Sequence, residues 1–458
     1  MGETLYSLGL DVGTTTTQLI LSELTVENCA GSFSVPRMEI TDRKIMYTGP
    51  VHMTPLLGED RVDGAAIRDL VEADFRRAGI RREQIDTGAV IITGETSRKE
   101  NAAAVLENLA SFSGEFVVAT AGPDLESRLA AQGSGAVGWS ARRCEKVLHM
   151  DIGGGTTNLA LICQGKIIKT GCLNVGGRLI RLDKAGTLTY VSPVLNGLTG
   201  LRVGQQPETA QLQQLAQLLT QALEMAAGLR PKTPLLDALQ TKEASSPWMP
   251  EPAEKLSFSG GVAECIRNNR EPLAFGDLGV LLGMCIARSD LCREPYLLEA
   301  HPVRATVIGA GCHSTQLSGS TVFLQNTQLP LKNMPTAVLS AREQALPADM
   351  LCSLITGRLE ALEQWGVLVL PGWNGPEYTK VTELADVIAR AVGNRPCYVA
   401  LVEDMAKVLG HALSLRLPDG TPCLCIDRVH IPPDSYLDVG SPVGSAICVV
   451  VKTLIFEQ

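Results

Sequence analysis

One alternation of hydrophobic and polar positions occurs twice in the chain, 140 residues apart. The segments LGLDVGTTTTQLIL (8–21) and LHMDIGGGTTNLAL (148–161) each place a short turn of Asp, Gly and Thr between two apolar runs, and Asp11 aligns with Asp151. An apolar strand, a tight turn and a second apolar strand are typical of a β-hairpin. The repeat therefore predicts two related hairpins in two related half-molecules.

Helical periodicity marks the segments between and after these hairpins. An amphipathic pattern runs from a candidate N-cap at Asp63 to a glycine stop at Gly79, and a further helix is expected to begin near Pro123. Apolar residues at steps of three and four in 207–229 predict an amphipathic helix packed on a core. The residues of that stripe are Leu212, Leu215, Leu219, Leu223 and Ala226.

Glycine-rich junctions characterise the remainder of the second half. The strand LSFS ends in the pair Gly260 and Gly261 and opens a helix, and GDLGVLLGMCIA from Gly276 is a small-residue helix suited to close packing. The segment RATVIGAGCHST from Arg304 is expected to be a strand that ends in a glycine turn. In residues 319–458 strands and helices alternate without another turn of the phosphate-binding kind, which predicts an appended α/β module.

Length, charge and hydropathy narrow the classes of function. At 458 residues the chain exceeds the usual size of a single core, so two or three domains are expected. The formal net charge of −9 and the absence of a basic stripe argue against nucleic-acid binding. No apolar run has the length of a membrane span, and no secretory signal pattern is present. The 13 cysteines are scattered and lack metal-ligand spacing, which is typical of free thiols in a reducing compartment. Together with the lack of a membrane span and a secretory signal, this predicts a cytoplasmic protein with no membrane partner.

The two turns are candidates for phosphate binding. Glycine lets backbone N–H groups approach an anion and threonine hydroxyls add donors, so a turn of this composition can hold phosphate oxygens. Asp11 and Asp151 are then placed to hold a magnesium ion, largely through its water molecules. Two such turns in register predict that both halves grip one polyphosphate and its metal. The expected phosphate contacts are Gly13, Thr14, Thr15 and Thr16 in the first turn and Gly153, Gly154, Gly155, Thr156 and Thr157 in the second.

These motifs resemble those of a known superfamily. DVGTTTT and DIGGGTTN are similar to the two phosphate motifs of the actin, Hsp70 and sugar-kinase ATPases, and FSGGVAE is similar to their adenosine motif. The resemblance covers roughly residues 1–310. It implies an α/β actin-like ATPase fold, in which two ribonuclease-H-like halves enclose a nucleotide cleft. It also implies ATP and Mg²⁺ as cofactors, with the adenosine near Gly260, Gly261 and Glu264.

The resemblance extends to the helices that connect the halves. Glu126 lies 25 residues before Asp151 and is followed by Ala130, Ala131 and Gly133. This helix resembles the first connecting helix, whose acidic residue lies near the catalytic water. Glu126 is therefore a candidate catalytic residue beside Asp11 and Asp151, with an exposed helix position as the alternative. The segment from Gly276 resembles the second connecting helix. VIGAGCHST from Val307 is kept as a rival adenosine site.

Within the superfamily the motifs narrow to one family. TGETSRKENA at Thr93, NVGGRLI at Asn174, VIGAGCHSTQLSG at Val307 and IDRVHIPPDSYLDVGSPVG near the C-terminus resemble the ethanolamine ammonia-lyase reactivating factors, across essentially the whole chain. The resemblance implies a molecular chaperone with ATPase activity that removes damaged cobalamin from adenosylcobalamin-dependent ethanolamine ammonia-lyase. The lyase is then its partner. Association with a bacterial microcompartment and formation of a homodimer are compatible with this interpretation.

The expected organisation and the competing functions follow from the same motifs. The first actin-like half is expected in 1–146, the second half with its phosphate loop and adenosine motif in 147–318, and the α/β module in 319–458. A small-molecule kinase of the same fold is one alternative, although we find no motif for the Asp base that it needs. An actin-like scaffold protein is another. Lys99 and Arg98 are candidates for the phosphate-contacting cation, but their distance from the first turn does not match well, so no lysine is assigned to phosphate.

Overall fold

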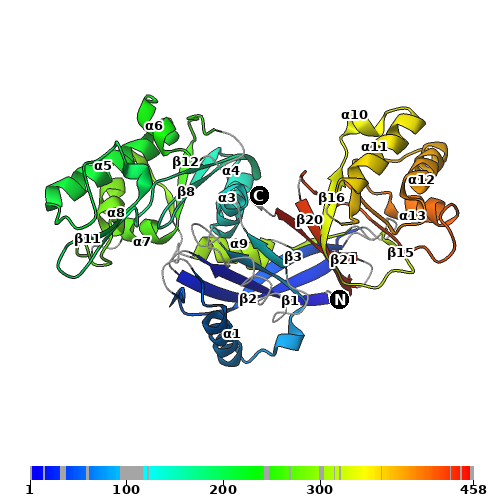
Figure 1. The fold of residues 1–458 in the computed structure, drawn as a ribbon, viewed down its shortest axis with the longest axis horizontal. Coiled ribbons are helices and arrows are strands. Elements are labelled where there is room, and N and C mark those ends of the chain that lie inside the picture. Colours follow the sequence, from blue (N-terminus) through cyan, green and yellow to red (C-terminus); the bar gives the residue numbers. More distant parts are fainter. Residues whose placement is uncertain are drawn as a thin grey trace.

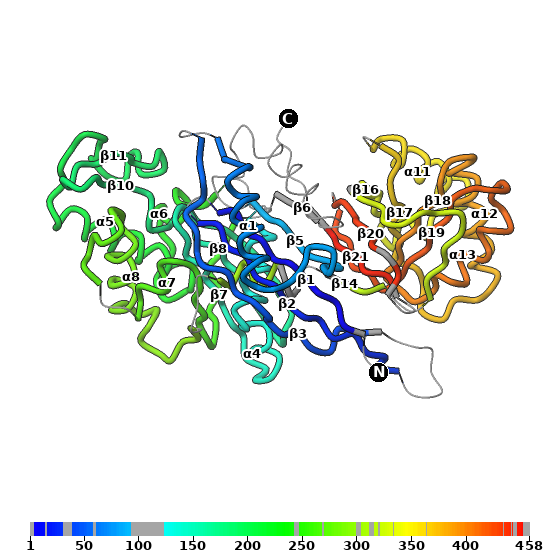
Figure 2. Tube along the Cα trace, turned by 90° about the horizontal axis from the view of Figure 1, so that it is seen from below, coloured from blue at the N-terminus to red at the C-terminus, as the bar shows by residue number. Residues whose placement is uncertain are grey.

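The structure is a computed structural model of the chain, drawn as a ribbon in Figure 1 and as a tube in Figure 2. A first sheet with its helices lies in the centre of Figure 1, a second sheet with its helices on one side, and a C-terminal module on the other. The residues that the structure describes are 3–13, 16–30, 38–57, 61–92, 117–120, 123–241, 247–267, 270–298, 304–313, 315–318, 321–362, 364–433, 435–443 and 446–453.

The first half is built on one mixed sheet. Its elements are β1 (Glu3–Val12), β2 (Thr16–Asn28), β3 (Met38–Thr48), β4 (His52–Met53), α1 (Gly64–Ala78), β5 (Thr87–Ile92) and β6 (Val117–Thr120). The strand order is β3-β2-β1-β5-β6, in which β1–β3 are antiparallel and β5 and β6 join in parallel, while β4 pairs with β2. The Asp63 carboxylate caps α1, and Gly79 ends it at φ 68°, which confirms the predicted helix.

The second half repeats this sheet. Its strands are β7 (Val147–Ile152), β8 (Thr157–Cys163), β9 (Lys166–Leu173), β12 (Lys255–Ser259) and β13 (Leu297–Leu298), with a small sheet of β10 (Ile180–Leu182) and β11 (Leu188–Val191). The order β9-β8-β7-β12-β13 matches that of the first half, with the antiparallel hairpin β7–β8 in the place of β1–β2. Both predicted hairpins are therefore confirmed.

Helices of the second half cover the outer face of its sheet (Figure 1). They are α5 (Thr209–Ala226), α6 (Pro234–Leu239), α7 (Gly261–Arg267) and α8 (Gly279–Ala287). The Leu stripe of α5 is buried in the same hydrophobic core as Leu148, Met150 and Ile152 of β7, as the periodicity predicted. Helix α8 packs on α5 and α7 inside this half, so the expectation that it connects the halves is wrong.

Two other helices join the halves. They are α3 (Pro123–Gly133), followed by α4 (Ala136–Arg143), and α9 (Ala305–His313). Helix α3 packs on β7, β8 and β9, whereas α9 returns to the first half and packs on β1, β2 and β5. A strand was expected where α9 lies. The close packing of α9 on α3 instead makes this segment a helix and gives it the connecting position.

The C-terminal module is a third α/β unit. Its elements are β14 (Thr315–Leu317), β15 (Phe323–Gln325), β16 (Leu331–Val338), α10 (Ala341–Gln344), α11 (Ala348–Glu360), β17 (Val367–Leu370), α12 (Tyr378–Val392), β18 (Cys397–Leu401), α13 (Ala406–Ser414), β19 (Cys423–Ile426), β20 (Ser435–Val443) and β21 (Ala446–Thr453). Strands β16–β19 are parallel, in an eight-stranded sheet of order β14-β21-β20-β16-β17-β18-β19-β15. Cys448 of β21 packs against Leu5, Leu24 and Val26, so the module rests on the first half (Figure 2).

No helix among the described residues is long and apolar enough to cross a membrane.

Candidate functional site

The described ends of the two hairpin turns are joined by equivalent backbone hydrogen bonds. The N–H of Gly13 donates to the carbonyl of Thr16 at 2.9 Å, and the N–H of Gly153 donates to the carbonyl of Thr156 at the same distance. Each Asp lies one residue before the last residue of its strand, where Asp11 pairs with Gln18 and Asp151 with Asn158. The aligned sequences thus close both turns with the same hydrogen bond. The remaining expected contacts of the first turn, Thr14 and Thr15, lie outside the described residues.

Alternation along the strands directs both Asp side chains towards the crossing helices. In β2, Leu19 and Leu21 pack in the core beneath α1, whereas Ile20 packs on Val307 of α9. In β1, the neighbours of Asp11, Leu10 and Val12, lie in the same core. The Asp11 side chain therefore lies on the opposite face of the sheet, on which α9 packs. On the second sheet Thr306, next to Val307 in α9, reaches Asp151 directly, with its Oγ1 3.4 Å from Oδ2. Helix α9 thus contacts both hairpins.

Asp151 is a buried acid, with 9% of its surface exposed. Ser259 Oγ donates to its Oδ1 at 2.5 Å and Thr306 to its Oδ2. Burial raises the pKa of the Asp151 carboxyl, and the two hydroxyl donors partly oppose this rise. A carboxylate in this environment is stabilised by a cation.

A second loop supports the turn after Asp151. The N–H groups of Gly177 and Arg178 donate to the carbonyls of Gly153 and Gly154 at 3.1 and 2.6 Å. A Cβ on Gly176 would lie 2.3 Å from the Gly154 carbonyl oxygen, so only glycine allows this approach. In contrast, a Cβ on Gly155 would meet no atom within 4 Å, which leaves this backbone accessible to a ligand.

Thr157 has a different environment from its neighbours in the turn. Its side chain is fully buried and its hydroxyl donates to the Val175 carbonyl at 2.7 Å. This hydrogen bond fastens the start of β8 to the supporting loop.

Glu126 lies in the first turn of α3 and is 8% exposed. Asn158 Nδ2 donates to Glu126 Oε2 at 2.8 Å, and Asn158 Oδ1 is buried without a hydrogen-bond partner. The alternative of an exposed helix residue is therefore wrong. Asn158 itself was not predicted as a site residue, although the repeat that aligns the two Asp residues also aligns it with Gln18.

The glycine pair after β12 has two distinct environments. Gly260 adopts φ 90°, and a Cβ there would lie 2.4 Å from the Ile152 carbonyl oxygen, so its role is to fit between the strands. A Cβ on Gly261 would meet nothing within 4 Å. Gly261 is thus the better candidate to face a nucleoside. Glu264, one turn further along α7, forms an ion pair with Arg270 at 3.3 Å.

The remaining candidates have other surroundings. The rival adenosine segment begins in α9, where a Cβ on Gly309 would lie 2.0 Å from the Leu129 carbonyl oxygen, so the backbone at Gly309 has no room for a nucleoside. Lys99 lies outside the described residues. Within the described ranges, no group of three or more His, Cys, Asp or Glu side chains could hold a metal ion by itself.

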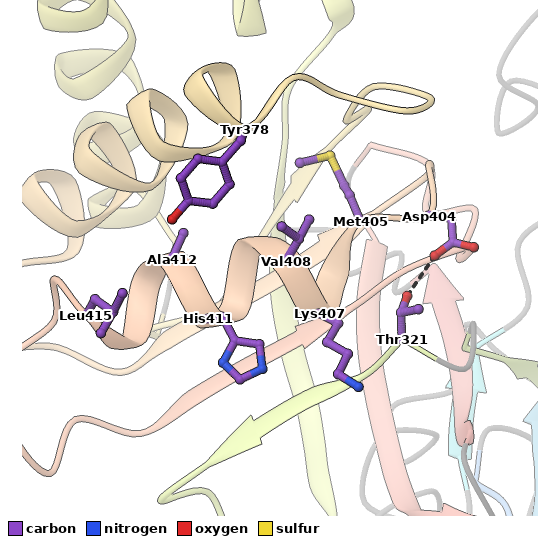
Figure 3. Close-up of a pocket in the computed structure, with 9 residues that line it drawn as sticks. All are labelled: Thr321, Tyr378, Asp404, Met405, Lys407, Val408, His411, Ala412 and Leu415. Carbon is purple, nitrogen blue, oxygen red and sulfur yellow. Dashed lines mark hydrogen bonds between the residues drawn. The ribbon is translucent and has the colours of Figure 1, made fainter. Parts of the chain in front are cut away.

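A cavity of about 420 Å³ lies in the C-terminal module between α12 and α13 (Figure 3). Figure 3 shows the Tyr378 ring above α13 and the hydrogen bond from Thr321 to Asp404, which is 2.8 Å long. Asp404 is also paired with Arg428. The other lining residues are Met405, Lys407, Val408, His411, Ala412 and Leu415. None of the predicted site residues lines this cavity.

The two sheets have the same strand order, each has an Asp before a tight hairpin turn, and crossing helices join them. These features define an α/β protein of the actin-like ATPase fold. The model of the family described as ethanolamine utilisation protein EutA matches residues 3–457. The chain is 37% identical to ethanolamine ammonia-lyase reactivase EutA of Salmonella typhimurium and 38% identical to that of Escherichia coli, in each case over 99% of both chains. It therefore belongs to the EutA family.

Solved structures are similar at a much greater distance. Ethanolamine utilization protein EutJ from Carboxydothermus hydrogenoformans is 15% identical, with 67% of this chain and 88% of that chain covered and a TM-score of 0.33. An activator of 2-hydroxyisocaproyl-CoA dehydratase from Clostridium difficile is 11% identical, with 67% and 93% covered and the same TM-score. Because these scores are low, the fold assignment rests on the strand order and the helix crossing.

Proposed function

We propose that this protein is an ATP-dependent reactivating chaperone for adenosylcobalamin-dependent ethanolamine ammonia-lyase. In this proposal it releases damaged cobalamin from the lyase so that intact coenzyme can bind. The lyase is suggested by the two relatives, which are named as its reactivases. The ATP-dependent step is supported by one observation, a pair of hairpins whose turns are closed by the same hydrogen bond and which each carry an Asp on the face towards α9.

The described residues fit a magnesium nucleotide. Carboxylate oxygens such as those of Asp11 and Asp151 suit Mg²⁺, which keeps several of its waters when bound. The backbone at Gly155 and Gly261 has open space where a side chain would lie. The unpartnered Asn158 Oδ1 is an acceptor for water at the same hairpin.

Each residue then has a defined task. Bound magnesium supplies neutralisation of the phosphate charge. Asp11 and Asp151 would hold the ion through its waters, and the N–H groups around Gly155 would bind phosphate oxygens. Asn158 fixes the Glu126 carboxylate at 2.8 Å, so that Glu126 can orient the attacking water or accept its proton.

The coupling to the lyase follows from the two connecting helices. A nucleotide that contacts both hairpins stabilises the arrangement in which the halves are close, and hydrolysis removes the contacts of the γ-phosphate. Helices α3 and α9 pack on each other and on opposite sheets, and the C-terminal module packs on the first half. In this proposal the helices transmit the change between the sheets and the module moves with the first half. The affinity for the lyase then alternates between two values.

The test starts from ethanolamine ammonia-lyase that is blocked with cyanocobalamin. Addition of this protein with ATP, Mg²⁺ and free adenosylcobalamin should restore lyase activity, whereas ADP should restore little because the γ-phosphate contacts are missing. No recovery with ATP would contradict the proposal. A phosphorylated small metabolite as product would favour the kinase alternative, and nucleotide-dependent sedimentation would favour the scaffold.

Replacement of Glu126 tests the water-orienting role. Glu126→Gln keeps the size of the side chain and a partner for Asn158 but removes the carboxylate, so ATP hydrolysis should fall by about 10²- to 10⁴-fold. Nucleotide affinity should change little, because Glu126 contacts the water and not the nucleotide. Steady-state hydrolysis and equilibrium binding measure the two quantities. Hydrolysis at the normal rate would leave Glu126 with a structural role only.

Replacement of Gly261 tests the adenosine contact. Gly261→Val projects a branched side chain into open space, so the fold should tolerate it while the affinity for ATP falls by at least about tenfold, or ~1.4 kcal/mol. Gly260→Ala is the informative comparison, because its Cβ collides with the Ile152 carbonyl and should lower the melting temperature. Unchanged ATP affinity in Gly261→Val would move the nucleoside elsewhere.

A further inference from the structure

A chain of hydrogen bonds leads from Asp151 into the second half. Parallel pairing of β7 with β12 sets His149 beside Ser257 and Asp151 beside Ser259, and strand alternation puts all four side chains on one face. Ser259 Oγ lies 2.5 Å from Asp151 Oδ1 and 2.9 Å from His149 Nε2, and Ser257 Oγ lies 3.0 Å from His149 Nδ1. His149 and Ser259 are completely buried.

The direction of each hydrogen bond follows from the number of hydrogens available. An ionised Asp151 only accepts, so the Ser259 hydroxyl donates its single hydrogen to Asp151. Ser259 can then only accept from His149, which places the ring hydrogen on Nε2. The Nδ1 atom of the neutral ring accepts from Ser257.

Core packing alone does not account for this arrangement. The other face of β7 carries Leu148, Met150 and Ile152, which fill the core without any polar atom in their side chains. A fully buried imidazole needs a partner for each nitrogen, because an unsatisfied buried polar atom is costly. Here each nitrogen has a serine of β12 as a partner, with Ser134 as a second neighbour of Nδ1, and Ser259 also holds the carboxylate of the candidate site.

We propose that His149 and Ser259 are positioning residues for Asp151. The Nε2–H of His149 donates to the hydroxyl oxygen of Ser259, so the one hydroxyl hydrogen of Ser259 points at the Asp151 carboxylate. Asp151 is thereby held in the orientation that binds the magnesium of ATP. Without the imidazole donor the Ser259 hydroxyl can rotate, and Asp151 keeps only the 3.4 Å contact with Thr306. This inference rests on the proposed function, since it assigns Asp151 to the metal.

Two serines of β12 provide a matched test. Ser259→Ala removes the donor to Asp151, and the Mg²⁺ concentration for half-maximal Mg²⁺-dependent ATP binding should rise by about 10- to 100-fold. Ser257→Ala removes an equally buried hydroxyl from the other nitrogen, where Ser134 Oγ lies 3.3 Å away and can replace it. It should leave the Mg²⁺ requirement nearly unchanged. Equal effects of the two substitutions would overturn the proposal.

Two replacements of His149 separate positioning from packing. The Gln amide nitrogen in His149→Gln reaches the place of Nε2 and can donate to Ser259, whereas the Asn amide in His149→Asn reaches only the place of Nδ1. We expect Gln to keep most of the Mg²⁺ affinity and Asn to lose as much as Ser259→Ala. A purely structural histidine would give losses that follow the drop in melting temperature, with no rescue by Gln.

The wild-type protein offers a measurement that needs no folded variant. The ¹⁵N shifts of histidine in the protein with Mg²⁺ and ADP should show a neutral ring with its hydrogen on Nε2 for His149, and a hydrogen on Nδ1 would overturn the inference. Asp151→Asn separates this outcome from a failure of the proposed function. If Asp151→Asn leaves the Mg²⁺ dependence intact, the metal assignment itself is wrong. If Asp151→Asn abolishes that dependence and Ser259→Ala does not, only the positioning role is wrong.

Discussion

Asp151→Asn is expected to lower magnesium-dependent ATP hydrolysis by at least about 10²-fold, the scale of losing one group that acts on developing charge. The amide keeps the shape of the side chain and its Oδ1 still accepts from Ser259, but it lacks the charge that attracts Mg²⁺. Asp11→Asn should have a similar effect, because Asp11 occupies the same position in the first hairpin. Steady-state hydrolysis measured against Mg²⁺ concentration gives the result.

The stability of Asp151→Asn should change in the opposite direction to its activity. Burial raises the pKa of the Asp151 carboxyl, so the ionised form is disfavoured in the folded protein without a cation, and a neutral amide removes this cost. The melting temperature without Mg²⁺ should therefore equal or exceed that of the wild type. Asp290→Asn, at a half-exposed acid in the same half, should leave both quantities unchanged. Full activity of either hairpin variant would contradict a shared magnesium site.

The hairpins could be predicted because the information is local. Each strand pairs with its neighbour across a turn of a few residues, so the apolar runs on either side of Asp11 and Asp151 contain the whole pattern. The amphipathic stripe of α5 is local in the same sense, since its apolar residues recur within a few turns of one helix. The antiparallel pairing of β1 with β2 and of β7 with β8 then follows from the repeat.

Features that depend on distant pairing could not be predicted. The segment of α9 contains Thr306, Val307 and Ile308, whose branched side chains favour strands, and its helix is stabilised by contacts with α3 far away in the sequence. Likewise, the sequence pattern around His149 indicates only a buried strand. Its serine partners come from β12, which pairs with β7 more than 100 residues later in the chain. The same pairing brings Ser259 to Asp151. Sequence patterns alone do not specify which distant strands become neighbours.

A side chain added at the crossing of α3 and α9 is expected to lower the stability of the protein strongly. A Cβ on Gly309 would lie 2.0 Å from the Leu129 carbonyl oxygen, and a Cβ on Gly133 would lie 1.9 Å from the Ala305 carbonyl oxygen. These obstacles are backbone atoms of the opposite helix, so no side-chain rotation can relieve them. Gly309→Ala should therefore force the helices apart and destabilise the protein by about 1–3 kcal/mol or more.

A second helical glycine, Gly357, provides a control for which the same substitution should have the opposite effect on stability. Gly357 lies inside α11, where a Cβ would meet no atom within 4 Å, so Gly357→Ala should stabilise the protein by about 0.5–1 kcal/mol through helix propensity. The two substitutions add the same atom to helices and should shift the unfolding midpoint in opposite directions. Because α3 and α9 join the two sheets, Gly309→Ala should also weaken ATP-dependent reactivation of the lyase, while Gly357→Ala should not. A Gly309→Ala protein as stable and as active as the wild type would show that the halves are not joined through this contact.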